Sequence, residues 1–350
     1  MHGTRRLARP SRRALIKGMA GLGLSVAGGS LLAGCAQQGA PFFSSRSGDR
    51  LETTRIRLSQ FAGICLAPQY MAADLLKAEG FTEVEYVPVE PARQYQAFAS
   101  GEVDVSMAFV APFILQLDAG TPIVLLGGVH AGCFELFGND SVRAIRDLKG
   151  KAVGVPGLGS AHHVFLSTMA AYVGLDPRVD IGWVSHDLAD SAQLLADGRV
   201  DALIAFPPIP QELRAKKIGH VVVDSAVDRP WSQYFCCALA ANRQFAEQHP
   251  VAAKRSLRAI LKAADLCANE PERAAQGIVD RGFTRDYGYA LQTMQGIPYH
   301  RWREYDLVDT VRFFALRLHE IGMIKSSPEQ IISQGTHLRF FNELKQELKV

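Results

Sequence analysis

Short apolar segments alternate regularly with helix-like segments along much of this sequence. The apolar segments predict strands at residues 56–58, 84–89, 103–109, 122–129, 152–155, 181–184, 202–206, 221–223 and 234–240. Several of the intervening segments have helical spacing and end at glycines such as Gly80, Gly101 and Gly174, which commonly stop helices. This alternation predicts an α/β fold of open sheets with helices on both faces.

Two further patterns refine that fold. Residues 122–129 are continuously apolar, which is typical of a strand inside a parallel sheet. After Asn242 the chain turns mostly helical, with amphipathic runs at residues 252–268, 308–321 and 338–348. No internal repeat recurs at a fixed period, so a solenoid is not indicated.

The first 34 residues have the order of an export signal: a basic block with Arg12-Arg13, an apolar run over residues 18–33, and Leu32-Ala33-Gly34-Cys35. The run is about 16 residues, shorter than the roughly 20 that cross a bilayer. The arginine pair resembles a twin-arginine signal, and the last four residues resemble a bacterial lipobox, which implies an acylated Cys35. An ordinary secretory leader with a chance arginine pair is the alternative. Residues 35–52 then read as a flexible tether.

The charge of the chain gives no indication of nucleic-acid binding. The 350 residues carry a formal net charge of +3, but residues 1–34 contain six cations and no acid. Removal of the signal therefore leaves a net charge of −3, and a basic nucleic-acid surface is not predicted. No later apolar run reaches about 18 residues, so no further membrane span is expected.

Five cysteines remain once Cys35 is assigned to lipid: Cys65, Cys133, Cys236, Cys237 and Cys267. Their spacing matches no zinc-finger pattern. The odd number leaves at least one thiol free within a single chain. Buried small side chains are the favoured interpretation, while a disulfide stays open for a chain outside the cytoplasm.

Ligands of open α/β sheets bind beyond the carboxyl ends of strands, near helix N-termini. Four junctions rich in small residues fit that position: residues 62–67, 109–112, 130–134 and 157–162. The glycines of residues 154–159 form neither a dinucleotide fingerprint nor a P-loop, so nucleotide binding is rejected.

Three kinds of chemistry at these junctions are weighed and set aside. His162-His163 suggests a metal site, but adjacent helical residues point about 100° apart, which favours one histidine at a pocket and one packed or solvated. Ser160 with His162 resembles a nucleophile and base, yet no nucleophile elbow surrounds Ser160. Cys65 and Cys133 are candidate nucleophiles, although buried structural cysteines are favoured.

Four segments carry a resemblance to a known family. They are Ala67-Pro68-Gln69-Tyr70-Met71-Ala72, Ala99-Ser100-Gly101-Glu102-Val103-Asp104, residues 147–155 (Asp-Leu-Lys-Gly-Lys-Ala-Val-Gly-Val) and residues 195–202 (Leu-Ala-Asp-Gly-Arg-Val-Asp-Ala). Over roughly residues 55–323 the chain resembles the solute-binding component of ABC importers of the nitrate, sulfonate and taurine type. That fold also includes the yeast thiamine-pyrimidine synthase.

The resemblance implies a two-lobed periplasmic-binding-protein type II fold, each lobe an open sheet flanked by helices, joined by two crossing strands. Residues 53–138 with 238–325 would form lobe I, residues 139–237 lobe II, and residues 326–350 a C-terminal helical extension. It also implies a monomeric, lipid-anchored extracytoplasmic protein whose partners are a small molecule and the permease and ATPase subunits. No cofactor, metal, nucleic acid or catalytic residue is implied.

Ligand contacts carried over from the family lie at the strand–helix junctions of both lobes and on the return crossing. They are Gly63, Ile64, Cys65, Leu66, Phe109, Val110, Ala111, His130, Cys133, Ser160, Ala161, His162, Phe206, Pro207, Tyr234 and Cys236. None of these stretches contains lysine or arginine, so an uncharged or aromatic ligand is favoured, and a nitrate or sulfonate held by backbone donors is the alternative. An enzyme like the pyrimidine synthase is less favoured, since only Cys236 and Cys237 align with its longer cysteine run.

Overall fold

The structure is a computed structural model that describes residues 50–349 apart from residues 62, 91 and 92. The predictions for the export signal, for Cys35 and for most of the tether fall outside the described residues. Among the residues that are described, no helix is both long enough and apolar enough for a membrane span.

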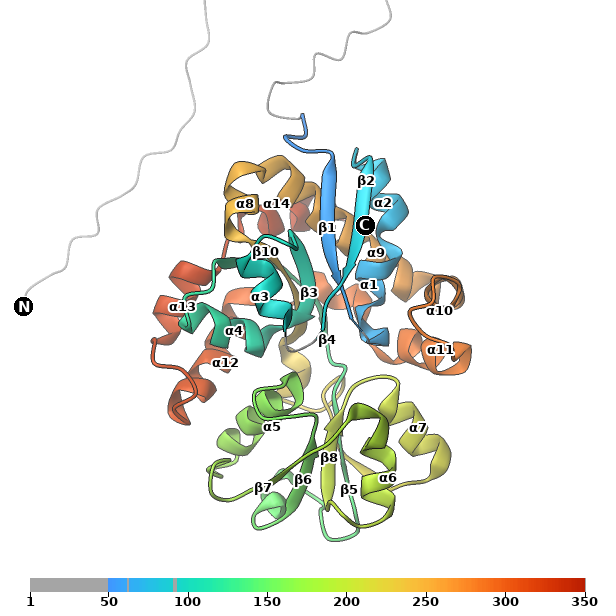
Figure 1. Ribbon diagram of the computed structural model, residues 1–350, viewed down its shortest axis with the longest axis vertical. Coiled ribbons are helices and arrows are strands. Elements are labelled where there is room, and N and C mark those ends of the chain that lie inside the picture. Colours follow the sequence, from blue (N-terminus) through green and yellow to red (C-terminus); the bar gives the residue numbers. More distant parts are fainter. Residues whose placement is uncertain (1–49, 62, 91–92, 350) are drawn as a thin grey trace, which may run out of the picture. The chain divides into compact units, whose positions relative to one another are not determined.

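Five strands form the first sheet, in the order β2-β1-β3-β10-β4 (Figure 1). β1 (Arg55–Gln60) runs parallel to β2 (Glu83–Pro88) and to β3 (Val105–Phe109). β10 (Phe235–Asn242) is antiparallel to both β3 and β4 (Ile123–Ala131). The sheet therefore combines an early parallel unit with one strand that returns from the far half of the sequence.

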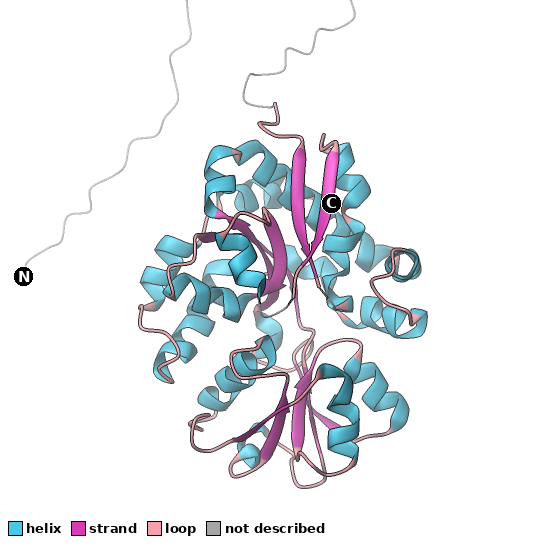
Figure 2. Cartoon of the chain, viewed as in Figure 1, coloured by secondary structure: helices cyan, strands magenta, loops and turns pink. Residues whose placement is uncertain are grey.

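The second sheet has the order β7-β6-β8-β5-β9. β6 (Ala152–Val155) is parallel to β7 (Gly182–Ser185) and β8 (Ala202–Ala205). β5 (Glu135–Gly138) is antiparallel to β8 and to β9 (His220–Asp224). Both sheets are mixed and flanked by helices, so the predicted α/β class is confirmed (Figure 2).

Helices occupy most of the remaining chain. Their bounds are α1 Ala67–Met71, α2 Ala73–Ala78, α3 Gln94–Ala99, α4 Val110–Asp118, α5 Ala161–Tyr172, α6 Ser191–Ala196, α7 Ile209–Lys216, α8 Arg243–Gln248, α9 Pro250–Asn269, α10 Pro271–Asp280, α11 Tyr287–Gly296, α12 Leu307–Glu320, α13 Pro328–Gly335 and α14 Arg339–Glu347. Their caps follow sequence rules: Asp306 accepts from the first N–H groups of α12, and Ser327 with Gln330 forms a capping box on α13.

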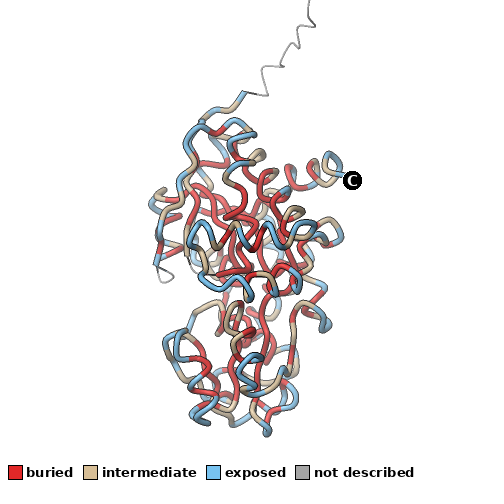
Figure 3. The backbone as a smooth tube through the Cα atoms, turned by 90° about the vertical axis from the view of Figure 1, so that its right-hand side faces the viewer, coloured by how far each residue is buried: buried red, intermediate tan, exposed pale blue. Residues whose placement is uncertain are grey.

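β4 departs from its predicted place inside a parallel sheet. It is the last strand of the first sheet and pairs antiparallel with β10. All nine of its residues are nevertheless buried, because α9, α14 and the 3-10 turn Tyr299–Arg303 pack against it. Buried segments run through the interior of the described chain, with exposed segments at the outside (Figure 3). The continuous apolar run therefore reports burial on both faces rather than parallel pairing.

The last two helices add to the first sheet's side of the molecule. Thr336, just after α13, forms an isolated bridge with Leu125 of β4. Lys254 of α9 pairs with Glu343 at 2.7 Å and with Glu347 at 2.6 Å, both on α14. These contacts attach the C-terminal helices to the elements that cover β4.

Two short connections link the sheets, and they touch each other. Residues 132–134 lead from β4 to β5, and residues 225–234 lead from β9 back to β10. The Ser225 hydroxyl accepts hydrogen bonds from the N–H groups of Cys133 (3.2 Å) and Phe134 (3.0 Å), and it donates to the Phe134 carbonyl (2.7 Å). The chain passes from the first sheet to the second through residues 132–134 and returns through residues 225–234. The lobe boundaries at residues 138 and 237 remain predictions.

Candidate functional site

Aromatic side chains from both sheets meet near the connections. Phe109 ends β3, Phe134 lies on the first connection, Phe165 is on α5, and Phe206 follows β8. The Phe109 ring centroid is 5.1 Å from that of Phe134 and 4.9 Å from that of Phe165, and the centroids of Phe134 and Phe206 are 5.5 Å apart. Together with His162 these residues are called the aromatic group below.

His162 lies against this group as a neutral imidazole. Its ring stacks on Phe206 with centroids 4.8 Å apart, and it forms a T-shaped contact with Phe134 at a centroid distance of 5.4 Å. Burial, with a smaller contribution from His186, lowers the pKa of His162 to about 3. Its Nε2 is buried without a hydrogen-bond partner, so the aromatic group includes one unsatisfied polar atom.

Predicted residues of the first junctions lie next to this group. A side-chain carbon added at Gly63 would lie 3.6 Å from the Phe206 ring, so the segment after β1 approaches the segment after β8. Ile64, Cys65 and Leu66 form a buried 3-10 turn there. Val110 and Ala111 are the buried first residues of α4, directly after Phe109.

Four other predicted residues lie at the start of α5, directly after Phe206 and on the return connection. Ser160 is the N-cap of α5, where its hydroxyl accepts from the His163 N–H at 3.3 Å, and Ala161 is the first residue of that helix. Tyr234 stacks on Phe313 of α12 with ring centroids 4.1 Å apart. Pro207 is buried beside Phe206. His163 packs against Trp183, so the two adjacent histidines diverge.

One ion pair adjoins the aromatic group. Glu135 directly follows Phe134, is 8% exposed, and pairs with Arg214 of α7. Burial raises the pKa of Glu135 to about 7, although Arg214 opposes that change. The cation at this edge of the site is therefore already matched by a carboxyl group.

Two surface cavities of the described residues lie elsewhere. A cavity of about 380 Å³ is lined by residues that include Met71, Asp74 and Arg281, and one of about 470 Å³ lies beside Trp231. Neither is lined by the aromatic group, whose side chains pack against one another.

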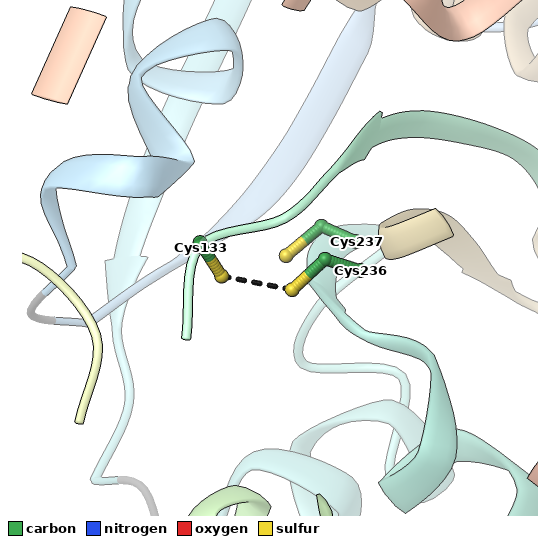
Figure 4. Close-up of side chains that lie close together, drawn as sticks. All are labelled: Cys133, Cys236 and Cys237. Carbon is green, nitrogen blue, oxygen red and sulfur yellow. Dashed lines mark hydrogen bonds between the residues drawn. The ribbon is translucent and has the colours of Figure 1, made fainter. Parts of the chain in front are cut away.

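A second cluster, called the thiol cluster below, consists of Cys65, Cys133, Cys236 and Cys237 with His130 (Figure 4 shows three of the cysteines). The sulfur atoms of Cys133, Cys236 and Cys237 all lie within 4.8 Å of one another, and all three residues are buried. The Sγ atoms of Cys133 and Cys236 are 2.8 Å apart. The five cysteines of the described residues are free and buried, as the favoured interpretation predicts.

The protons of this group are unevenly held. Burial raises the pKa of Cys133 and of Cys236. Burial also acts to raise the pKa of Cys237, but hydrogen bonds from the neighbouring thiols and the charge of His130 outweigh it, and the pKa falls well below its usual value. For His130 burial lowers the pKa, and Cys237 with two backbone carbonyls raises it by more.

His130 is oriented by its surroundings. Its Nδ1 lies 3.0 Å from the Gly132 carbonyl, which accepts the ring proton, and its Nε2 is buried without a hydrogen-bond partner. Its ring faces Tyr299 at 5.1 Å, and the Tyr299 hydroxyl donates to the Cys65 carbonyl at 3.0 Å. Thiolates are donors that a soft metal ion prefers, so Cys133, Cys236 and Cys237 are where the described chain offers metal ligands.

Sequence reasoning missed several members of both groups. Phe134 and Phe165 do not belong to the predicted contacts, and neither does Cys237. Tyr299, which donates to the Cys65 carbonyl beside the thiol cluster, is absent from them as well. For the aromatic group, the available signal was the presence of phenylalanine at residues 109, 134, 165 and 206. Tyr299 lies more than 200 residues from Cys65, and no spacing of residues in the sequence places it beside the thiol cluster.

Comparison with known proteins relates this geometry to two sets of relatives. A pyrimidine phosphate synthase of Saccharomyces cerevisiae, "4-amino-5-hydroxymethyl-2-methylpyrimidine phosphate synthase THI5", is 23% identical over 218 residues, which are 58% of this chain. The match spans 63% of the length of that relative.

The second set consists of solved structures. The periplasmic nitrate-binding protein NrtA from Synechocystis PCC 6803 superposes with a TM-score of 0.70 at 15% identity, over 86% of this chain and 90% of that one. The putative periplasmic sulfonate-binding protein SsuA from Methylobacillus flagellatus KT gives 0.65 at 18% identity, over 85% and 96%. These likenesses establish a periplasmic-binding-protein-like fold for this chain, as the sequence predicts.

The family follows from a match that covers more than half of the chain. The family model described as "NMT1/THI5 like" matches residues 66–274. This range begins a few residues after β1 and ends within α10. This chain belongs to the NMT1/THI5-like family.

Proposed function

We propose that this protein is an extracytoplasmic solute-binding lipoprotein of an ABC importer, which captures a small uncharged or aromatic molecule. The observation that carries the proposal is the aromatic group, in which Phe109 from the first sheet, Phe134 from a connection and Phe206 from the second sheet meet. Flat apolar surfaces with few polar groups suit an aromatic or uncharged ligand.

The electrostatics of the site support that ligand class over an anion. Arg214 is paired with Glu135, the residue that directly follows Phe134. His162 is neutral at neutral pH and offers one donor or one acceptor. A nitrate or sulfonate would therefore depend on backbone N–H groups, which keeps an anion as the second candidate.

Binding is proposed to work through the two connections. A ligand that contacts residues of both sheets favours the conformation in which those residues are close, by about 1.4 kcal/mol for each tenfold preference. Small-angle X-ray scattering with and without saturating ligand tests this step. Unchanged dimensions would rule out closure.

An enzyme of the pyrimidine-synthase kind is the alternative. The cysteines of the thiol cluster and the similarity to the yeast relatives favour it. The two functions differ in whether the ligand is recovered unchanged. Mass spectrometry of the small molecule after incubation separates them, because a binding protein returns what it took up.

Ligand identity is the decisive test. The protein, purified as the cell produces it, is screened by thermal shift against pyrimidines, aromatic acids, riboflavin, sulfonates and nitrate. A ligand at a hundred times its Kd stabilises the folded state by about 2.7 kcal/mol. The proposal expects a hit among the uncharged or aromatic compounds, and a response to the anions alone would replace it.

A further inference from the structure

Cys133 and Cys236 occupy the two places where the chain passes between the sheets. Cys133 lies on the first connection, and Cys236 is the second residue of β10, directly after the return connection. We infer that these two thiols form a reversible disulfide that ties the two connections together. The inference rests on the extracytoplasmic location proposed above, since disulfides persist in oxidising compartments.

The strand geometry explains why Cys236 reaches Cys133. Phe235 pairs with Ala131 and Cys237 pairs with His130, with a shift of register between the two pairs. Cys236 therefore lies at an irregularity in the ladder, and such bulges redirect side chains that would otherwise alternate. This is how the sulfurs of the adjacent Cys236 and Cys237 come within 4.8 Å of each other (Figure 4).

The distance between the sulfurs favours a covalent bond over a shared metal ion. Two sulfurs on one tetrahedral ion, each about 2.3 Å from it, stand about 3.8 Å apart. Two sulfurs of a disulfide stand about 2.05 Å apart. The observed 2.8 Å is shorter than the metal geometry by about 1 Å, and a smaller movement closes it to a bond.

The surroundings hold the pair in place from both sides. The Cys133 N–H donates to Ser225 of the return connection. A side-chain carbon at the neighbouring Gly132 would lie 2.3 Å from the Ala226 backbone, so the two connections are in direct contact there. Both thiols are 5% exposed, which leaves an exchange partner a narrow approach.

The chemical step is thiol–disulfide exchange with glutathione disulfide or an oxidised dithiol protein. One cysteine thiolate attacks a sulfur of the oxidant and releases one thiol; the second thiolate then attacks the mixed disulfide and releases the other. Two protein thiols are oxidised, one external disulfide is reduced to two thiols, and the two protons end on those thiols.

The bond would close a loop of about 100 residues that contains the whole second sheet. Such a link restricts the unfolded chain, and it also fixes the separation of the two connections about which the sheets would move. Oxidation should therefore limit the opening that ligand exchange requires.

Peptide mapping tests the inference without any ligand. The protein, purified as the cell produces it, is equilibrated in glutathione buffers of increasing oxidised fraction, quenched with acid, alkylated and digested. We expect a linked peptide that joins Cys133 to Cys236, loss of two alkylatable thiols, and a rise in Tm on the order of 5 °C on oxidation. Cys133→Ser and Cys236→Ser should lose both effects, and Cys267→Ser, another buried cysteine, should keep them.

Three results would overturn the inference. They are five alkylatable thiols at every buffer composition, a linked peptide that contains Cys65 or Cys237 instead, and a metal ion that copurifies with the wild type and blocks alkylation. The wild-type map is informative even where a variant fails to fold. Because no ligand is used, a negative map leaves the proposed solute binding intact, and failure of the ligand screen leaves the map intact.

Discussion

The ring of Phe109 lies 4.9 Å from that of Phe165. Phe109 is the last residue of β3 in the first sheet, whereas Phe165 belongs to α5, the helix that follows β6 of the second sheet. Phe134, on the connection between the sheets, touches both rings. The aromatic group is thus built from elements of both sheets and from the connection between them. A ligand that inserts between them would contact both sheets at once.

Phe206→Ala is expected to weaken ligand binding about 10- to 100-fold, because it removes the ring that stacks on His162 and faces Phe134. Phe206 is half-buried, so the fold should tolerate the change. Isothermal titration with the screened ligand measures the effect. Phe283→Ala, which removes another half-buried ring, stacked on Tyr70 at 3.8 Å, is the matched control. Equal affinity in both variants would place the binding site elsewhere.

Phe109→Ala tests the same group from the first sheet. The side chain is buried, so a stability loss of about 3 to 5 kcal/mol accompanies the loss of binding. Ligand affinity is therefore compared at a temperature where circular dichroism shows the variant to be folded. Wild-type affinity under those conditions would exclude Phe109 from the site.

Gly132→Ala is expected to cost about 3 kcal/mol or more of unfolding free energy. Gly132 has φ +65°, and an added side-chain carbon would lie 2.3 Å from the Ala226 backbone, so strain and a clash combine. Gly174→Ala is the matched control, since Gly174 has φ +85° and open space around it. It should cost about 1 to 2 kcal/mol. Urea denaturation measures both, and equal losses would mean that the connections do not press on each other there.

Stability should fall on acidification because of His162. Its pKa is about 3 in the folded protein and about 6.5 when unfolded, so the unfolded chain binds the extra proton between these values. The stabilising effect is complete above pH 6.5 and is lost, at up to about 1.4 kcal/mol per pH unit, as the pH falls toward 3. His162→Phe should show a shallower loss of Tm between pH 7 and 4.5. His300→Gln, at an exposed histidine, should follow the wild type, and parallel curves for all three proteins would contradict the assignment.

Local elements followed from the sequence because local rules determine them. The alternating pattern and the stop signals placed β6 at Ala152–Val155 and α5 at Ala161–Tyr172 within a residue or so. The segment of helical spacing that ends at Gly80 is instead divided into α1 and α2. β5 was missed because Glu135–Gly138 contains only two apolar side chains, Leu136 and Phe137, and so carries little periodicity.

Relations between distant residues did not follow from the sequence. The place of β4 at the end of its sheet depends on the return of β10, about a hundred residues later, which no local pattern reports. Phe109, His162 and Phe206 belong to one group of packed rings, whereas Tyr234 packs on α12, and their role as ligand contacts stays a prediction. Cys237 was missed since neighbouring residues of a regular strand face opposite ways, and only the irregular pairing of β10 brings its sulfur beside that of Cys236.

Cys35→Ser tests the proposed lipid anchor, which lies outside the described residues. If Cys35 carries the lipid, its replacement removes the acyl chains, and the residues that the structure describes contain no helix that would retain the protein in a membrane. The variant should then appear in the soluble fraction while the wild type sediments with membranes. Cys267→Ser, a change at a buried cysteine of α9, should sediment like the wild type. A Cys35→Ser protein that still sediments, and resists extraction by high salt, would contradict the anchor and return the first 34 residues to the ordinary secretory leader.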